Sequence, residues 1–252
     1  MSYTVEVNSY TLEDVKRSES CKADRVELCA DANVGGVTPS FGIIEHCVKQ
    51  LSIDVAVLIR PREGGFTYSK RELEIIKQDV RTIGEIGADC AVIGMLNENA
   101  TVDQKNTAEL VDLAKSYQME ITFHRAFDLV PDPYRALESL ADLGVDRVLT
   151  SGQARTAELG LELLTDLVEK YKQQIGIMPA VAVTADNVVK FLEAGIREVH
   201  VRPTTKIQDC MKWTREDVHM GPSDRDESRI TSVDKDELRK LVEKVRGFES
   251  SS

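Results

Sequence analysis

The sequence has no excess of positive charge. Its 252 residues include 32 Lys and Arg against 43 Asp and Glu, which gives a formal net charge of −11. Basic residues are interleaved with acidic ones throughout. A protein that holds a nucleic acid or an anionic lipid surface needs a basic patch to displace counterions. The charge pattern therefore disfavours both kinds of partner.

Long apolar runs are also missing. The first residues lack the ~7–15 apolar residues of a secretory signal, and nothing approaches the ~18 apolar residues of a membrane span. We therefore expect a cytoplasmic protein. No linker rich in Pro, Gly or Ser divides the chain. We expect one domain over residues 1–252.

Paired cysteines are absent as well. The five cysteines are odd in number and scattered, and none forms a CxxC pair. This excludes a disulfide framework and gives no sign of a zinc cluster.

What the sequence does have is a regular alternation of short β-rich runs and helical periodicity. Strand and helix in alternation indicate parallel βαβ units. Eight such units in about 250 residues predict an α/β fold of the (β/α)8 TIM-barrel type, with a doubly wound sheet as the alternative. The eight runs are 3–8, 24–29, 55–60, 91–96, 120–124, 147–150, 177–181 and 198–202.

Helix boundaries carry their own signals. Ser69 with Glu72 predicts a capping box, Thr38 followed by Pro39 predicts a helix start, and Gly87, Gly144 and Gly195 predict left-handed turns before strands. The exceptions are residues 203–234, expected to be a long irregular loop before the last helix, and 247–252, expected to be a frayed tail.

Polar residues recur where the predicted strands end. The carboxyl ends of barrel strands form the active-site face, and alternate residues share a face of a strand. On this rule we expect one self-compensating cluster, with Glu6 and Glu27 as anions, Arg60 as a cation and His124 as the group that titrates near neutral pH. Thr150, His200 and Arg202 lie at strand ends too. The cluster fits a small anionic ligand, although its members could also pair only with one another.

The densest motif is TFHRAFD (122–128). It offers His124 for proton transfer, Arg125 as an anion clamp and Asp128 as a carboxylate that orients either, unless Asp128 only caps a turn. The motif TSG, with Thr150, Ser151 and Gly152, is expected to hold an anion at a helix start.

Several of these segments together resemble the CutC family of copper homeostasis proteins. They are RVELC (25–29), GGVTPSFG (35–42), IRPR (59–62), TFHRAFD (122–128), RVLTSG (147–152), MKW (211–213) and MG (220–221). The resemblance implies a single barrel, an oligomeric cytoplasmic protein and Cu(I) binding. It places Glu6, Glu27, Arg60, His124, Arg125, Asp128, Thr150, Ser151, Gly152 and His200 at family positions near the barrel mouth.

The sequence departs from the family at two places. The family's copper site is implied to use a first-strand cysteine beside a second-strand one. Cys29 matches the second, but Asn8 replaces the first, and Cu(I) prefers two soft donors. A glycine-rich turn is replaced by residues that include Ala180 and Ala182, and Arg202 stands where a small residue is expected.

Two main hypotheses follow. In the first, the protein serves copper homeostasis and binds Cu(I) through Cys29. In the second, it is a barrel enzyme for a small anionic metabolite, with His124 as general acid or base and Glu27, Arg60 and Asp128 beside it. A barrel kept only as a scaffold is a third possibility, since fold does not decide function.

Overall fold

The computed structural model describes residues 3–211, 213, 215, 218, 226 and 228–250. Eight strands alternate with helices up to β8, after which come two further strands and a last helix. The strands are β1 Thr4–Ser9, β2 Arg25–Leu28, β3 Asp54–Leu58, β4 Cys90–Ile93, β5 Glu120–Phe123, β6 Arg147–Thr150, β7 Gly176–Pro179, β8 Glu198–Val201, β9 Thr204–Gln208 and β10 Arg229–Val233. The helices are α1 Leu12–Ser20, α2 Phe41–Gln50, α3 Lys70–Ile86, α4 Gln104–Ser116, α5 Pro133–Asp142, α6 Leu161–Tyr171, α7 Val188–Glu193 and α8 Lys235–Glu249.

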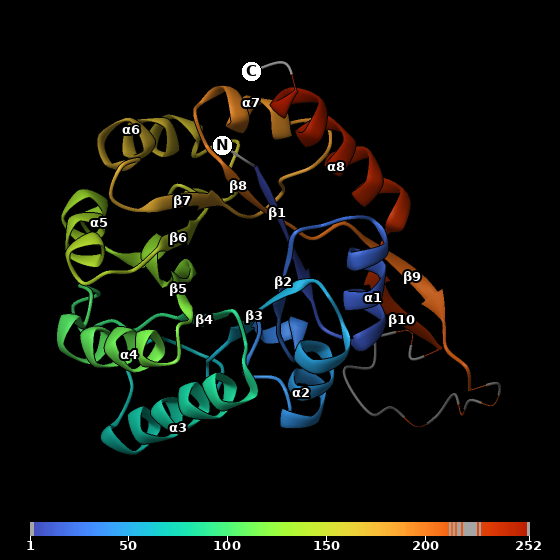
Figure 1. Cartoon of the computed structure of the whole chain (residues 1–252), viewed down its shortest axis with the longest axis horizontal. Helices are drawn as coiled ribbons and strands as arrows, with labels where there is room; N and C mark the ends of the chain where they lie inside the picture. Colours follow the sequence, from blue (N-terminus) through green and yellow to red (C-terminus); the bar gives the residue numbers. More distant parts are fainter. Residues whose placement is uncertain are drawn as a thin grey trace.

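The eight parallel strands form the barrel that the sequence predicts. Their hydrogen-bonded order runs from β7 through β6, β5, β4, β3, β2 and β1 to β8, and the two end strands β7 and β8 pack against each other. The helices surround this ring (Figure 1). All eight predicted runs overlap an observed strand.

Local signals explain most element boundaries. Ser69 and Glu72 form the predicted capping box of α3, and Gly87 ends that helix at a φ of 93°. The predicted start of α2 at Thr38 is wrong by two residues, because Ser40 is the N-cap. The Thr38 hydroxyl is engaged elsewhere and accepts a hydrogen bond from the backbone N–H of Arg60 at 2.9 Å.

The apolar core lies mainly between the strands and the helices. Along β1, Val5 and Val7 belong to this layer and are fully buried, whereas Glu6 and Asn8 alternate with them. The inside of the barrel holds two smaller apolar clusters, one around Ala56, Leu58 and Cys90 and another around Leu149 and Met178. This period-2 alternation directs charged side chains of the strands into the barrel.

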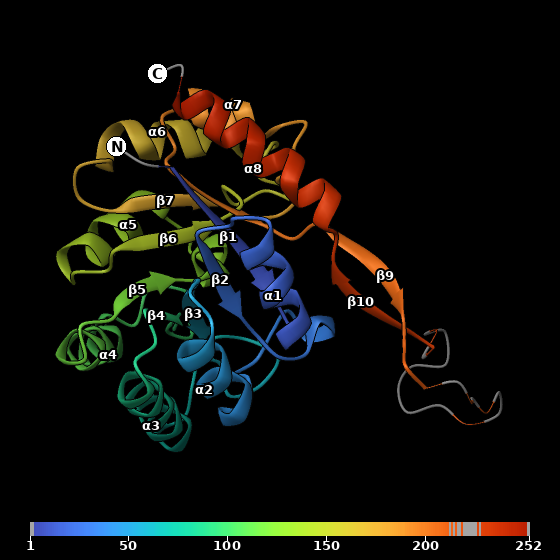
Figure 2. The same cartoon turned by 45° about the vertical axis from the view of Figure 1, so that its right-hand side comes forward.

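The prediction of an irregular loop over 203–234 is wrong at both ends of the segment. Strands β9 and β10 pair antiparallel, with Thr204 opposite Val233 at one end and Gln208 opposite Arg229 at the other. They form a ribbon that extends away from the barrel (Figure 2). Thr, Ile and Val in TTKIQ and RITSV supply the β preference. On α1, the carboxylate Oδ1 of Asp14 anchors the ribbon, accepting hydrogen bonds from the Ser232 hydroxyl at 2.7 Å and the Val233 N–H at 2.9 Å.

The C-terminal helix is longer than expected. Helix α8 continues to Glu249 with Ser250 as its C-cap, so residues 247–249 are not a frayed tail. Residues 251 and 252 lie outside the described residues, as do Lys212, Met220 and Gly221 of the MKW and MG motifs. Within the described part of the chain, no helix is both long and apolar enough to cross a membrane.

Candidate functional site

A pocket of about 640 Å³ opens at the carboxyl ends of the strands. Its polar lining comes from strand ends, from the loops that follow them and from the first turn of α8. The lining residues that carry polar or charged groups are Asn8, Tyr10, Glu27, Arg60, His124, Arg125, Thr184, His200, Arg202 and Glu237. We call this cavity the mouth pocket.

Glu27 and His200 form the deep polar wall of the mouth pocket. Glu27 is 5% exposed and His200 is 8% exposed. The Nε2 atom of His200 lies 3.8 Å from Oε2 of Glu27, and its Nδ1 atom lies 2.7 Å from Oε1 of Glu6. Asn8 donates an amide hydrogen bond to Oε2 of Glu27 at 2.7 Å. One imidazole thus stands between two carboxylates.

The carboxylates and the imidazole alter one another's proton affinity. Burial alone would raise the pKa of Glu6, but Arg25 and His200 outweigh it and hold that pKa at about 2. Burial would lower the pKa of His200, but the hydrogen bond that its ring donates to Glu6 and the charges of Glu27 and Glu6 raise it. Burial, together with the charge of Glu6, raises the pKa of Glu27. The two groups that face the pocket therefore both have raised pKa values.

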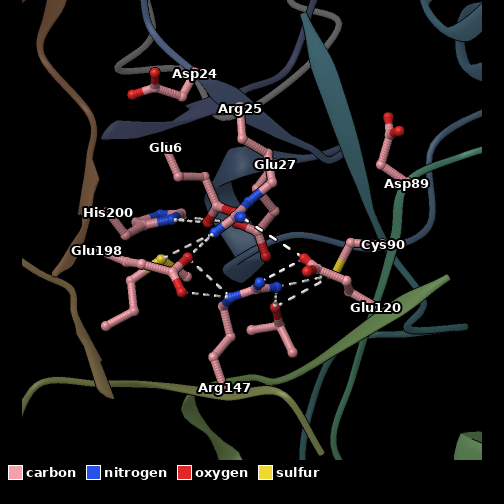
Figure 3. A network of polar contacts seen from close by, with 12 residues as sticks. Glu6, Asp24, Arg25, Glu27, Asp89, Cys90, Glu120, Arg147, Glu198 and His200 are labelled. Carbon is pink, nitrogen blue, oxygen red and sulfur yellow. Dashed lines mark hydrogen bonds and ion pairs between the residues drawn. The ribbon is translucent and has the colours of Figure 1, made fainter. Parts of the chain in front are cut away.

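The cation of this cluster is Arg25, whereas the sequence led us to expect Arg60. Arg25 donates through Nε to Oε2 of Glu6 at 2.5 Å and through Nη2 to Oε2 of Glu198 at 2.5 Å. Arg147 joins Glu198 at 2.9 Å and also pairs with Glu120. Figure 3 shows these side chains converging inside the barrel. We call Arg25, Glu120, Arg147 and Glu198 the floor network, because each is the first residue of its strand.

Arg60 has a different task. Its Nη1 donates to the carbonyl oxygens of Val34 at 2.8 Å and Gly36 at 2.9 Å, and its Nη2 donates to the carbonyl of Gly64 at 2.7 Å. It therefore ties together two loops at the rim. Its Nε is buried and has no partner among the described residues, so this N–H stays available.

His124 does not meet a carboxylate, so the predicted pairing with Glu6 or Glu27 is wrong. Its Nδ1 accepts the backbone N–H of Ala126 at 3.1 Å, and its ring packs against that of Phe66 with centroids 4.8 Å apart and a tilt of 52°. Burial and then the charge of Arg60 lower its pKa to about 3, so it is neutral near pH 7. With Nδ1 accepting, the proton sits on Nε2, which is buried and unpaired among the described residues. A Cβ at Gly94 would overlap this ring.

Asp128 fastens the end of β6. Its Oδ1 accepts from the Thr150 hydroxyl at 2.5 Å and from the N–H groups of Ser151 at 3.0 Å and Gln153 at 3.2 Å. Its Oδ2 accepts from Nε of Arg125 at 2.7 Å. Thr150 and Ser151 of the TSG motif thus hold an internal carboxylate, while the Gly152 N–H donates to the Thr150 hydroxyl at 2.9 Å. The prediction that they hold a ligand at a helix start is wrong, since α6 begins only at Leu161.

Arg202 is exposed at the pocket rim. Its guanidinium carbon lies 4.5 Å from the ring centroid of Tyr10, and both residues line the mouth pocket. On the same rim, Val181 and Ala182 have φ angles of 76° and 59°. These left-handed conformations strain residues with a Cβ, a β-branched one most. They occupy the place where the sequence departs from a glycine-rich turn.

Cys29 does not fit a Cu(I) site. The thiol is buried beside Asn8, whose amide nitrogen lies 3.4 Å from the sulfur. Burial and the charge of Glu27 raise the pKa of the Cys29 thiol well above its ordinary value, whereas copper binds the thiolate. No group of three or more His, Cys, Asp or Glu side chains suited to a metal occurs among the residues that the structure describes.

Sequence reasoning missed the floor network. Arg25 lies two residues before Glu27 on the same face of β2, and Glu198 lies two residues before His200 on β8. The period-2 rule, applied to strand starts as well as strand ends, would have found both.

Fold and pocket together define a (β/α)8 barrel protein with a polar site at its mouth. The sequence profile of the CutC family matches residues 3–205. The chain therefore belongs to the CutC family.

Relatives support this assignment over the length of the chain. A family protein CutC of Vibrio cholerae is 37% identical over 251 residues, 99% of both chains. One from Proteus mirabilis is 41% identical over 220 residues, 87% of both chains. The crystal structure of CutC from Streptococcus agalactiae, provisionally described as a copper homeostasis protein, superimposes with a TM-score of 0.74 at 32% identity, covering 79% of this chain and 97% of that one. A structure described as native KDPGal, at 12% identity and a TM-score of 0.56, covers 99% of this chain and 100% of its own and shows the fold alone.

Proposed function

We propose that the protein binds a small anionic metabolite in the mouth pocket and moves a proton on it with Glu27 and His200. The observation that carries this proposal is the pair itself. Both side chains are buried, both line a pocket of about 640 Å³, and their facing atoms are 3.8 Å apart. Buried groups with perturbed proton affinity in a cleft are typical of acid–base sites.

The rest of the pocket suits an anion. Arg125 and Arg202 line its rim, Arg60 has an unpaired buried Nε–H, and neutral His124 has an unpaired Nε2–H among the described residues. In ionised form, Glu27 accepts a proton from the ligand, and the electron pair left behind stays on the ligand until the His200 imidazolium donates a proton to it. The guanidinium groups and the His124 N–H stabilise the charge that develops there. His124 thus contributes as a hydrogen-bond donor, and Glu27 takes the role of the base.

Thermal-shift measurements against sugar phosphates and small di- and tricarboxylic acids test this proposal. At least one class raises the Tm of the wild type, and the shift is lost in Arg202→Gln. The matched control is Arg197→Gln. Arg197 is also exposed, and its guanidinium carbon also lies over a tyrosine ring, 4.8 Å from the centroid of Tyr3. It directly precedes β8, at the end of that strand opposite Arg202. If no compound raises the Tm, or if Arg197→Gln abolishes the shift equally, the proposal is wrong.

A role in copper homeostasis, the role given to the Streptococcus relative, is the second candidate, and we propose that it is indirect. The support is the geometry around Cys29, which provides one protonated thiol and the hard amide of Asn8. The test is anaerobic Cu(I) competition against a coloured chelator, with the wild type and Cys29→Ser side by side. Neither protein removes copper from the chelator. Competition by the wild type that Cys29→Ser loses would establish a direct Cu(I) site instead.

A further inference from the structure

Glu6 is a buried carboxylate inside the barrel. Glu6 contacts both His200, which lines the mouth pocket, and Arg25, which does not (Figure 3). Glu6 is 1% exposed. Its carboxylate is therefore almost completely desolvated, and contacts with these two neighbours stabilise its charge.

A buried Glu–His pair has two forms that contain the same number of protons. In one, the proton is on the imidazole and the pair is ionic; in the other, the proton is on the carboxyl oxygen and both groups are neutral. A low-dielectric interior favours the neutral form, because each isolated charge is costly to desolvate. A fixed cation beside the carboxylate favours the ionic form.

Arg25 is that fixed cation. Its Nε lies 2.5 Å from Oε2 of Glu6, while the imidazole nitrogen Nδ1 of His200 lies 2.7 Å from the other oxygen, Oε1. The guanidinium is thus in contact with the carboxylate and is separated from the imidazole by it. Its attraction for the Glu6 anion therefore exceeds its repulsion of the imidazolium.

The floor network keeps Arg25 in place. Glu198 binds both Arg25 and Arg147, so the two guanidinium groups share one carboxylate. Charged or titratable groups near the Glu6–His200 pair come from several elements: Arg25, Glu27 and Cys29 from β2 and its end, Tyr10 after β1, Glu198 and Arg202 from β8 and its end, and Cys90, Glu120 and Arg147 from β4, β5 and β6. Among them, Arg25 is the cation that touches Glu6.

We propose that Arg25 is a positioning residue that keeps the shared proton on His200 by holding Glu6 as an anion. It does so from the floor of the barrel, outside the mouth pocket. The inference rests on the proposed function, because it concerns the proton of the same His200. If the inference holds, Arg25, which does not line the mouth pocket, determines whether the His200 ring in that pocket is an imidazolium or a neutral imidazole.

The test is the ¹⁵N NMR spectrum of the His200 ring at pH 7, which distinguishes imidazolium from neutral imidazole without any ligand. The chain contains four histidines, so His200→Gln assigns the signal. The wild type and Arg25→Lys give an imidazolium. In Arg25→Gln the proton moves to Glu6, and the ratio of imidazolium to neutral ring falls by about tenfold or more.

Arg147→Gln is the matched control. Arg147 is as buried as Arg25, starts a strand and binds Glu198, but it does not touch Glu6. It leaves His200 as an imidazolium. An unchanged ring in folded Arg25→Gln, or the same change in Arg147→Gln, overturns the inference.

If Arg25→Gln does not fold, Glu6→Gln carries the test. Glu6→Gln removes the hydrogen bond and the adjacent charge that favour the imidazolium and leaves only Glu27, 3.8 Å from Nε2, to favour it. The ratio of imidazolium to neutral ring therefore falls, and an unchanged ratio contradicts the inference. A ligand screen that finds nothing would refute the proposed function and leave this NMR result intact, so the two failures are distinguishable.

Discussion

Asn8 is the residue that separates this chain from a two-thiol copper site. Its amide nitrogen lies 3.4 Å from the sulfur of Cys29 and 2.7 Å from Oε2 of Glu27. A cysteine at this position would place a second sulfur beside the first. The polar environment that now binds Glu27 would become one that suits a soft metal.

We therefore predict that Asn8→Cys gains Cu(I) affinity by about tenfold or more over the wild type. The measurement is the same anaerobic chelator competition. The double variant Asn8→Cys with Cys29→Ser is the control, because it keeps the new thiol and removes its partner. Equal affinity in the single and double variants would show that the two positions do not form a joint site.

Ala182 has a left-handed backbone that a glycine would adopt without strain. Its φ is 59° and its side chain is exposed, so the methyl group contributes no core packing. We predict that Ala182→Gly stabilises the protein by about 0.5–1 kcal/mol, because the relief of strain exceeds the added chain entropy of the unfolded state. Urea unfolding measures the change.

Ala185 provides the comparison for this substitution. It lies in the same loop but is buried and has no left-handed φ among the described positions. Ala185→Gly is expected to destabilise by about 1 kcal/mol. Stabilisation by both variants, or by neither, would mean that backbone strain at residue 182 has no energetic consequence.

At the scale of elements, the contact between the segment after β5 and the end of β6 depends on one carboxylate. Asp128 is 7% exposed in its side chain and accepts hydrogen bonds from Thr150, Ser151 and Gln153. We predict that Asp128→Ala costs about 2–4 kcal/mol of unfolding free energy, since several buried donors lose their acceptor. Chemical denaturation gives this value.

A nearby aspartate tests whether any capping carboxylate has the same effect. Asp132 is exposed and caps α5 by accepting the N–H groups of Tyr134 and Arg135. Asp132→Ala should cost about 1 kcal/mol, as for other N-caps. A cost for Asp128→Ala no larger than this one would show that the contact does not hold the two loops together.

The elements themselves were predictable to different degrees. Each of the eight barrel strands carries a β-rich run between helical segments, so local pattern and fold agree and the barrel could be predicted. The ribbon of β9 and β10 could not, because its two strands are short, exposed over most of their length and separated by about twenty residues of charged sequence. Pairing over such a distance leaves little local signal.

The site was predicted less well than the fold. The alternation of side chains between the two faces of a strand correctly places Glu6, Glu27 and His200 inside the barrel. It does not say which side chains contact one another. The Arg60 guanidinium donates to backbone carbonyl oxygens of loops at the barrel mouth, such as that of Val34. The His124 ring accepts a hydrogen bond from the backbone N–H of Ala126. These choices depend on loop conformations that arise only in the folded chain.

At the scale of the whole molecule, the buried Glu6–His200 pair links stability to pH. The pKa of Glu6 is lowered from 4.5 to about 2, so its contribution is present above pH 4.5 and is lost as the pH falls toward 2. The pKa of His200 is raised from 6.5, so its contribution is complete below pH 6.5 and is lost as the pH rises through the higher folded value. The raised pKa of Glu27 acts in the same direction as that of His200.

We predict that the free energy of unfolding is greatest at mildly acidic pH and declines on both sides. In His200→Gln the decline above pH 6.5, the ordinary pKa of histidine, becomes shallower because the titrating imidazole is gone. Exposed His46 on α2 is the control, and His46→Gln keeps the wild-type slope. Urea unfolding at pH intervals from 3 to about 9 provides the curves. A wild-type curve that keeps rising above pH 6.5 would mean that His200 is not held as an imidazolium in the folded protein.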